Sequence, residues 1–116
     1  MGSRAETLNR KRMRYGFGVG FEEYNRENII KVRDLQAELM SNGDYIGYFD
    51  TYGGSLRVFL FDNESGRDKA LKEAKQIGFT SAGKCEGVIS VSNAEIKRPH
   101  LDNIRNSHAF YRELYR

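Results

Sequence analysis

Several residue types and patterns are scarce in this chain of 116 residues, and each absence narrows what the protein can be. Cys85 is the only cysteine, so no intramolecular disulfide can form, which favours a reducing compartment. No apolar run approaches the roughly 20 residues that a membrane-spanning helix needs. The basic N-terminus is not followed by the apolar stretch of a signal peptide. We therefore expect one soluble domain in the cytoplasm.

Groups that commonly carry catalysis are also few. The soft metal ligands are Cys85, His100 and His108, and their positions match no zinc-binding spacing. The acidic pairs Glu22–Glu23 and Asp62–Glu64 lie at predicted strand ends, where solvated carboxylates are ordinary. No set of nucleophile, base and orienting group is visible, although a Cys85 nucleophile with a histidine base stays open as an alternative. The sequence predicts a non-catalytic protein without metal or cofactor.

Charge is unevenly distributed, although the net charge is only +3. Residues 1–14 contain five basic residues and one acidic residue, and residues 97–116 contain five basic and two acidic residues. The central part, residues 15–96, therefore carries a net charge of −4. A polyanion would meet the two basic ends first. The alternative is that both ends are simply solvated basic tails.

Hydrophobic periodicity and turn residues predict alternating strands and helices. Gly53-Gly54 separates two strand-like runs and predicts a two-residue hairpin turn of the primed type. That turn sets the register, so that Asp50 lies opposite Arg57 and Tyr48 lies opposite Phe59. In chain order, we predict a strand at 15–21, a helix within 25–43, the hairpin within 44–62, a helix within 64–79 and a half-exposed strand within 84–92.

This order of elements resembles the ferredoxin-like superfold, an α+β fold with the element order βαββαβ. The resemblance covers roughly residues 13–92 and is topological. It implies a four-stranded antiparallel sheet with two helices on one face, in which the first strand is central, between the third and the fourth. We divide the chain into a basic N-terminal arm (1–14), the ferredoxin-like domain (15–92) and a C-terminal extension (93–116) with an added helix that begins near Pro99.

The first predicted strand alternates glycines with large apolar residues. We expect Phe17 and Val19 to face the helices, together with the aliphatic residues Leu56, Val58 and Leu60 of the hairpin. The glycines would then form a bare trough on the uncovered face, where a base, a ligand ring or a partner could approach. The opposite phasing stays open, as does burial of this face by the C-terminal helix or by a symmetric dimer. The walls of the trough would be Tyr48, Arg57, Phe59 and Phe61.

The third predicted strand carries Arg57, Phe59 and Phe61, a basic residue followed by aromatic residues two and four positions on. This spacing resembles that of RNA-recognition motifs, and the resemblance implies base stacking on the two rings. The chain departs from that pattern at Val58 and Leu60, where small residues are expected. The run GVGF resembles the phosphate loop of acylphosphatases, but Glu22 stands where that loop has an arginine.

The leading hypothesis is a small non-catalytic binding protein that acts stoichiometrically on a nucleic acid or nucleoprotein. One alternative is a protein-directed inhibitor, like the compact proteins that phages encode against host defence, acting through the acidic body as a homodimer. Another is a regulatory or sequestering protein that holds a nucleotide in the glycine trough. The predicted partner-binding residues are Arg10, Lys11, Arg12, Arg14, Tyr48, Arg57, Phe59, Phe61, Arg105, Tyr111 and Arg112, with Gly16, Gly18 and Gly20 as close-approach glycines.

Overall fold

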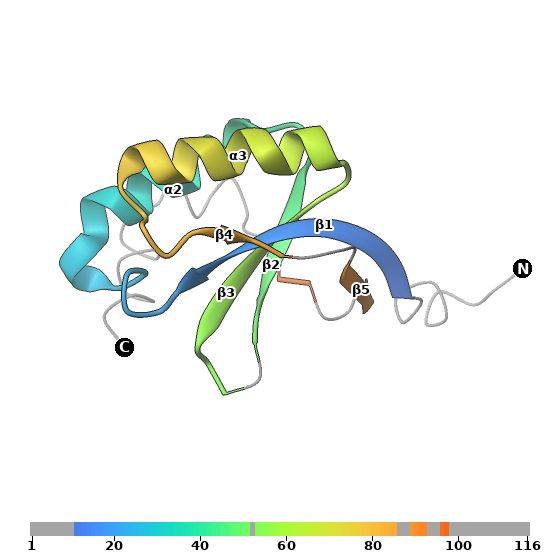
Figure 1. Cartoon of the computed structure of the whole chain (residues 1–116), viewed down its shortest axis with the longest axis horizontal. Helices are drawn as coiled ribbons and strands as arrows, with labels where there is room; N and C mark the ends of the chain where they lie inside the picture. The colour runs from blue at the N-terminus through green and yellow to red at the C-terminus, as the bar shows by residue number, and fades with distance from the viewer. Residues whose placement is uncertain (1–10, 52, 86–88, 93–95, 98–116) are drawn as a thin grey trace, which may run out of the picture.

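The computed structural model describes an α+β fold in which two helices lie on one face of an antiparallel sheet (Figure 1). It describes residues 11–51, 53–85, 89–92 and 96–97, with the backbone alone at residues 11–13 and 90–92. Four strands follow the order β2-β3-β1-β4, and β5 pairs with the first half of β1. The elements are β1 (Lys11–Gly20), the short 3-10 helix η1 (Arg26–Asn28), α2 (Ile29–Ser41), β2 (Tyr45–Asp50), β3 (Leu56–Phe61), α3 (Glu64–Ile77), β4 (Gly83–Lys84) and β5 (Ile89–Ser92).

Local sequence fixes both ends of α3. Asn63 caps the N-terminus, because its side chain accepts a hydrogen bond of 2.7 Å from the N–H of Gly66. At the C-terminus, Gly78 adopts a φ of +121° and Phe79 packs into the core behind it. Gly78 therefore ends the helix as a C-terminal glycine cap.

The hairpin of β2 and β3 turns at Gly53-Gly54, where both residues have positive φ, as a primed turn requires. Asp50 pairs with Arg57 in the predicted register. Further from the turn, a bulge shifts the pairing, so that Tyr45 rather than the predicted Ile46 lies opposite Phe61. The turn therefore determines the register only as far as the bulge.

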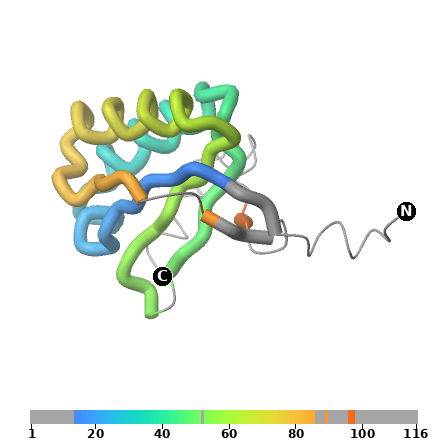
Figure 2. Tube along the Cα trace, turned by 45° about the vertical axis from the view of Figure 1, so that its right-hand side comes forward, coloured from blue at the N-terminus to red at the C-terminus, as the bar shows by residue number. Residues whose placement is uncertain are grey.

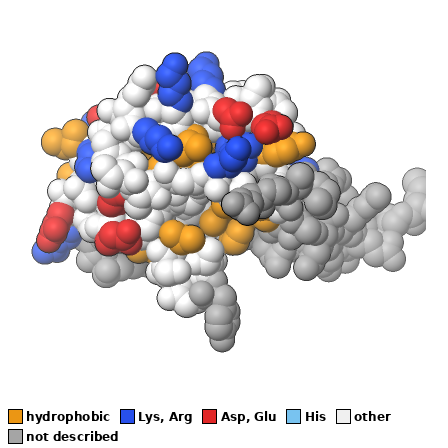
Figure 3. All heavy atoms as spheres, viewed as in Figure 1, with side chains coloured by type: hydrophobic (Ala, Val, Ile, Leu, Met, Phe, Trp, Pro, Cys, Tyr) orange, Lys and Arg blue, Asp and Glu red, His pale blue; other side chains and the backbone are white. Residues whose placement is uncertain are grey.

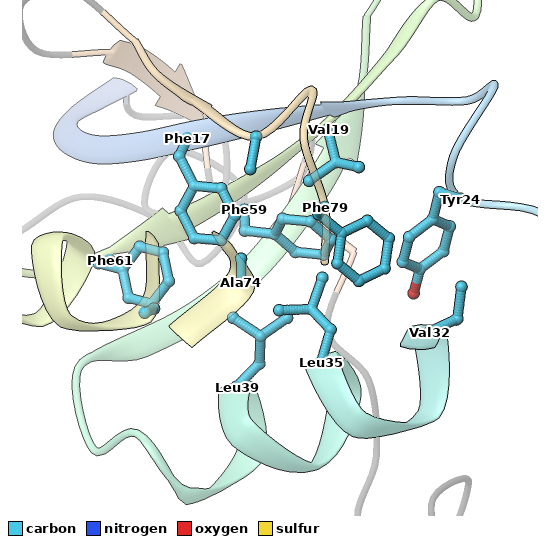
Figure 4. Close-up of a cluster of buried hydrophobic side chains, with 12 residues drawn as sticks. Phe17, Val19, Tyr24, Val32, Leu35, Leu39, Phe59, Phe61, Ala74 and Phe79 are labelled. Carbon is cyan, nitrogen blue, oxygen red and sulfur yellow. The ribbon is translucent and has the colours of Figure 1, made fainter. Parts of the chain in front are cut away.

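The main core lies between the sheet and the helices, and aromatic rings from the strands fill it (Figure 4). Phe17 on β1 lies 5.3 Å from Phe59 and 5.8 Å from Phe61, measured between ring centroids. All three rings are fully buried, against Leu35 and Leu39 of α2 and apolar residues of α3. Each ring removes about 150–250 Å² from water, so this face gains the most from burial under the helices.

The predicted orientation of the hairpin is therefore wrong. Leu56, Val58 and Leu60 were expected beneath the helices, but Phe59 and Phe61 are found there instead. The register explains the inversion: Phe59 lies directly opposite Phe17, and residues opposite each other in neighbouring strands share a face. A strand that turns Phe17 toward the helices thus turns the aromatic face of β3 the same way.

The glycines of β1 lie on the face away from the helices, as predicted, but that face is partly covered. Val58 and Leu60 form a second, smaller apolar cluster there with Ile96. Lys97 and Tyr48 exchange two backbone hydrogen bonds, of 2.9 and 2.7 Å. Ile96 therefore packs on this face, and Lys97 pairs with the outer edge of β2. In the turned view of Figure 2 the helices remain together on one side of the sheet.

Parts of the predicted organisation lie outside the described residues. These are most of the N-terminal arm, the helix predicted near Pro99, and the candidate binding residues Arg10, Arg105, Tyr111 and Arg112. Lys11 and Arg12 belong to β1, of which only the backbone is described at those two positions. Among the described helices, none has both the length and the apolar character needed to cross a bilayer.

Glu23 joins two loops at one end of the fold. Its carboxylate accepts hydrogen bonds from the N–H and hydroxyl groups of Thr80, at 3.0 and 3.2 Å, and from the N–H of Ser81. The Nζ of Lys31 lies 3.9 Å away. Burial works to raise the pKa of Glu23, but the hydrogen bonds from Ser81 and Thr80 outweigh it and hold the pKa below its ordinary value. Glu23 thus has a structural role, whereas the sequence left it as one half of an acidic pair.

We expect Glu23→Gln to lower the free energy of unfolding by about 1–2 kcal/mol at pH 7, because the new amide presents a donor to backbone N–H groups. The lowered pKa of Glu23 means that its stabilisation is complete above the unfolded value of about 4.3 and is lost as the pH falls through the folded value. Urea denaturation at pH 7 and pH 3 should show the difference from wild type shrinking at pH 3. Glu22→Gln, at an exposed neighbour, is the control. An equal deficit at both pH values would contradict this assignment.

Candidate functional surface

Phe59 and Phe61, the two rings predicted to stack on bases, are 0% exposed beneath the helices. Base stacking requires a ring face open to the ligand. The resemblance to RNA-recognition motifs therefore holds for the spacing along the strand and fails for the position of the rings. The prediction that these residues lie on an uncovered face is wrong, because the larger rings fill the space between sheet and helices better than the aliphatic residues do.

Arg57, the basic residue of the same pattern, is enclosed by aromatic side chains. Its guanidinium carbon lies 4.4 Å from the ring centroid of Tyr48, 4.8 Å from that of Tyr24 and 5.5 Å from that of Phe21. The Nε and Nη2 atoms donate to the two carboxylate oxygens of Asp50, at 2.8 and 3.2 Å. The side chain is 19% exposed. Arg57 therefore has its charge partner and its stacking partners within the protein.

The titration of the groups around Arg57 follows from these contacts. Burial alone would lower the pKa of Arg57, but the hydrogen bonds to Asp50 and the neighbouring tyrosines outweigh it and raise that pKa. Burial also raises the pKa of Tyr24 to about 12, against the opposing field of Arg57. Both groups keep their ordinary charge at neutral pH. The cluster works as a fixed ion pair between aromatic rings, which is a structural arrangement.

Each glycine of β1 has a neighbour where the sequence predicted a bare trough. A Cβ atom on Gly16 would lie 2.8 Å from both the carbonyl oxygen of Phe59 and the side chain of Ile89. On Gly20 it would meet the carboxylate of Glu22, whereas on Gly18 its nearest neighbour would be Leu56 at 3.7 Å. The glycines do permit close approach, as predicted, but what approaches them is this chain's own backbone and side chains.

Arg67 is a buried arginine that the sequence analysis did not single out. Its side chain crosses from α3 to β1, where Nη1 donates to the carbonyl oxygen of Gly16 at 3.3 Å, the same oxygen that accepts from the N–H of Cys85 at 3.0 Å. Arg67 also pairs with Asp68 at 2.6 Å and Glu64 at 3.5 Å. These contacts hold α3 to the strand and occupy both carboxylates of the first turns of the helix.

Four exposed lysines share the side of the molecule formed by α3 and the edge strand β4. Lys69, Lys72 and Lys75 follow one another at three-residue spacing on α3. Lys84 lies on β4 opposite Phe17, so its side chain leaves the sheet on the face that carries the helices. In the space-filling view of Figure 3, Lys and Arg side chains stand along α3, with acidic side chains near the end where the helix begins.

Arg67 occupies the two carboxylates in the first turns of α3. Arg67 pairs with Glu64 and Asp68, which leaves Glu73 as the remaining acidic residue of α3. Within the described part of the chain, no carboxylate lies within 4.0 Å of any of the four lysine ammonium groups. The sequence analysis missed this surface because it counted charge by segment, where acidic residues elsewhere in 15–96 outweighed it. The signal that could have found it was the lysine spacing itself.

Of the predicted N-terminal arm, the structure describes residues 11–14, with the backbone alone at 11–13. β1 begins at Lys11, at the end of the sheet next to the N-terminus of α3, where Arg14 lies 3.8 Å from Asp62. The Tyr15 ring lies 5.9 Å from the guanidinium carbon of Arg67 in the first turns of α3. Arg14 and Tyr15 of β1 therefore lie near the first turn of α3.

Metal-binding clusters are absent from the described residues. No group of three or more His, Cys, Asp or Glu side chains within them could hold a metal ion. Cys85 is half-buried, and burial raises the pKa of its thiol, with Arg67 opposing that effect. A raised pKa disfavours the thiolate that a nucleophile needs. His100 and His108, its possible bases, lie outside the described residues.

We expect Gly16→Ala to lower the free energy of unfolding by about 1–3 kcal/mol, because its methyl group would press on the backbone of Phe59. Gly18→Ala is the matched control: the new Cβ would lie in ordinary contact with Leu56, so the stability should stay within about 1 kcal/mol of wild type or rise slightly. Urea denaturation of both variants measures the contrast. Equal losses would show that the two glycines are equivalent, against this packing.

We expect Arg57→Gln to destabilise the protein by about 2 kcal/mol, because it leaves Asp50 without its bidentate partner and the rings without a cation. Lys97→Gln is the control, since Lys97 also lies near Asp50, at 3.8 Å, but is mostly exposed. Its loss should cost less than about 0.5 kcal/mol. Chemical denaturation gives both values, and a near-neutral Arg57→Gln would show that the cluster adds no stability.

No family model, no curated protein and no solved structure matches the chain.

Proposed function

We propose that this protein is a small non-catalytic binding protein that acts stoichiometrically on a nucleic acid or nucleoprotein. The observation that carries the proposal is the surface formed by Lys69, Lys72, Lys75 and Lys84, whose ammonium groups are exposed and have no carboxylate partner within the described part of the chain. Clustered lysines on one face of a domain are typical of surfaces that contact phosphate backbones. The basic residues in the sequence of the arm, residues 1–14, would add to the attraction for a polyanion.

The proposed binding is to the phosphate backbone. Lysine is a flexible point charge and contacts phosphates without recognising a base. The rings that could have stacked on bases, Phe59 and Phe61, lie in the core, and Arg57 is held by Asp50. Such binding is tolerant of sequence and weakens steeply as salt is added, because each neutralised phosphate releases condensed counterions.

The ferredoxin-like assignment belongs to the same proposal. Its support is the position of β1, which lies between β3 and β4. From the edge at β4, the strands follow the order fourth, first, third and second in the chain, with β5 as a continuation of the fourth strand beyond residues 85–88. This superfold carries many unrelated functions, so the assignment does not itself favour nucleic-acid binding.

A protein partner is the second candidate, as for an inhibitor directed at a host complex. The observation that favours it is Ile30 on α2, which is 69% exposed among the polar residues of that helix. Such a residue can act as the apolar anchor of an interface. A nucleotide held in the glycine trough loses its support, because Ile89, Leu56 and Glu22 lie next to the three glycines.

We expect the full chain to bind a fluorescently labelled oligonucleotide at low salt, with an affinity that falls linearly on a logarithmic plot against salt. The variant Lys72→Gln/Lys75→Gln should lower the magnitude of that slope by about two, one for each phosphate contact removed. Fluorescence anisotropy titrations across a salt series measure both quantities.

The matched control is Arg26→Gln/Arg33→Gln, which removes the same charge from exposed positions of η1 and α2. Its slope should stay close to that of the wild type. If the oligonucleotide fails to bind even at low salt, the proposed function is wrong. If the two double variants weaken binding equally, net charge rather than the α3 surface is responsible.

A further inference from the structure

The lysines of α3 spread around the helix instead of following its axis. The residues that define the inward direction of the helix are its buried ones, Gly66, Arg67, Ala70 and Ala74. At about 100° per residue, Lys72 points almost directly away from them, and Lys69 and Lys75 diverge from it by about 60° to either side. The outward side of α3 is therefore a convex ridge with positive charge on its crest and on both flanks.

One flank of this ridge lies at the edge of the sheet formed by β4. Arg67 lies on the same side of the helix as Lys75, and its side chain donates to the carbonyl oxygen of Gly16 on β1. The same oxygen accepts a hydrogen bond from the N–H of Cys85, the residue that follows Lys84. Lys75 and Lys84 therefore belong to one flank, at this edge of the sheet.

The opposite flank lies toward α2 and β2. Gly66 lies on the side of the helix that carries Lys69, and a Cβ atom on Gly66 would meet the side chain of Asp44, just before β2. Lys69 and Lys75 are separated by about 9 Å along the axis and by the width of the helix, roughly 10–12 Å. Their ammonium groups therefore reach two separate lines of negative charge.

Single strands and duplexes present their phosphates differently. Proteins that bind single strands typically use a positively charged groove that follows one backbone, with rings on which the bases stack. α3 forms a ridge, and neither α3 nor β4 contains an aromatic residue. A duplex presents two backbones, one on each side of a groove, and the major groove of B-form DNA is about 12 Å wide. This width is close to the separation of the two lysine flanks.

We propose that the α3 surface binds double-stranded DNA in preference to single strands, with one backbone on each flank of α3. Lys69 contacts phosphates of one strand, Lys75 and Lys84 contact phosphates of the other, and Lys72 faces the groove between them. Duplex RNA fits less well, because its major groove is narrow. This binding mode depends on the proposed function and adds the form of nucleic acid that the surface accepts.

Exchanging two neighbouring residues of α3 tests this arrangement at constant net charge. Lys75→Gln/Gln76→Lys moves one lysine by about 100° around the helix, from the flank at β4 to the flank of Lys69, and both positions are exposed. We expect the wild-type chain to bind a short DNA duplex more tightly than either of its separated strands. The exchange should lower the magnitude of the logarithmic salt slope for the duplex by about one, because one phosphate contact is lost. It should not lower the slope for the single strand.

The charge-matched control is Arg33→Ala/Ala37→Arg, which moves a cation between exposed positions of α2 and should keep the preference for the duplex. Fluorescence anisotropy across a salt series measures the affinities, and circular dichroism checks that each variant is folded. If the wild type binds neither probe at low salt, the proposed function is wrong and this inference with it. If the wild type binds both probes equally, or if the exchange leaves the duplex slope unchanged, this inference alone is wrong.

Discussion

The pairing of β1 with β3 determines most of this structure. β1 presents large apolar side chains on one face and bare glycines on the other, so only one of its faces can form a thick core. Because Phe17 lies directly opposite Phe59, the aromatic face of β3 must share the side that the helices cover. The aliphatic face of β3 is then left to pair with the glycines, where Ile89 and Ile96 complete a thinner layer.

That partition decides which side chains can meet a partner. Phe59 and Phe61, the rings predicted to stack on bases, are buried in the core. Arg57, on the same strand, is enclosed by Tyr24, Tyr48 and Phe21. A second internal contact involves Arg67 of α3. Its side chain donates a hydrogen bond to β1 and forms ion pairs with two carboxylates of α3. The lysines of α3 have no carboxylate within 4.0 Å among the described residues and form an exposed positive surface on the same helix.

Local signals in the sequence predicted where the strands and helices occur. They did not predict which face of the hairpin lies beneath the helices. The Gly53-Gly54 turn acts within a few residues, because a turn depends on little beyond its own neighbours. The choice between the two faces of β3 depends on which strand pairs with it and in which register, and both faces of LRVFLF are apolar enough to be buried. The amphipathic pattern therefore does not distinguish the two faces. The aromatic face has the larger apolar surface area, and its burial beneath the helices is the more favourable. The bulge at Ile46 and the buried Arg67 depend in the same way on contacts made far along the chain.

The close packing on this face also explains why glycine, a poor strand former, stands at some positions of β1. A strand with side chains at Gly16 could not let β3 and Ile89 close on it, since a Cβ there would meet a backbone carbonyl. At Gly18 no such contact exists within the described residues, and the neighbouring Leu56 is still partly exposed. The glycines of one stripe thus differ in what surrounds them: a Cβ at Gly16 would meet a backbone carbonyl, whereas a Cβ at Gly18 would have only neighbours at ordinary van der Waals distance. A stripe that looks uniform in sequence is therefore required to be glycine at one position and not at the next.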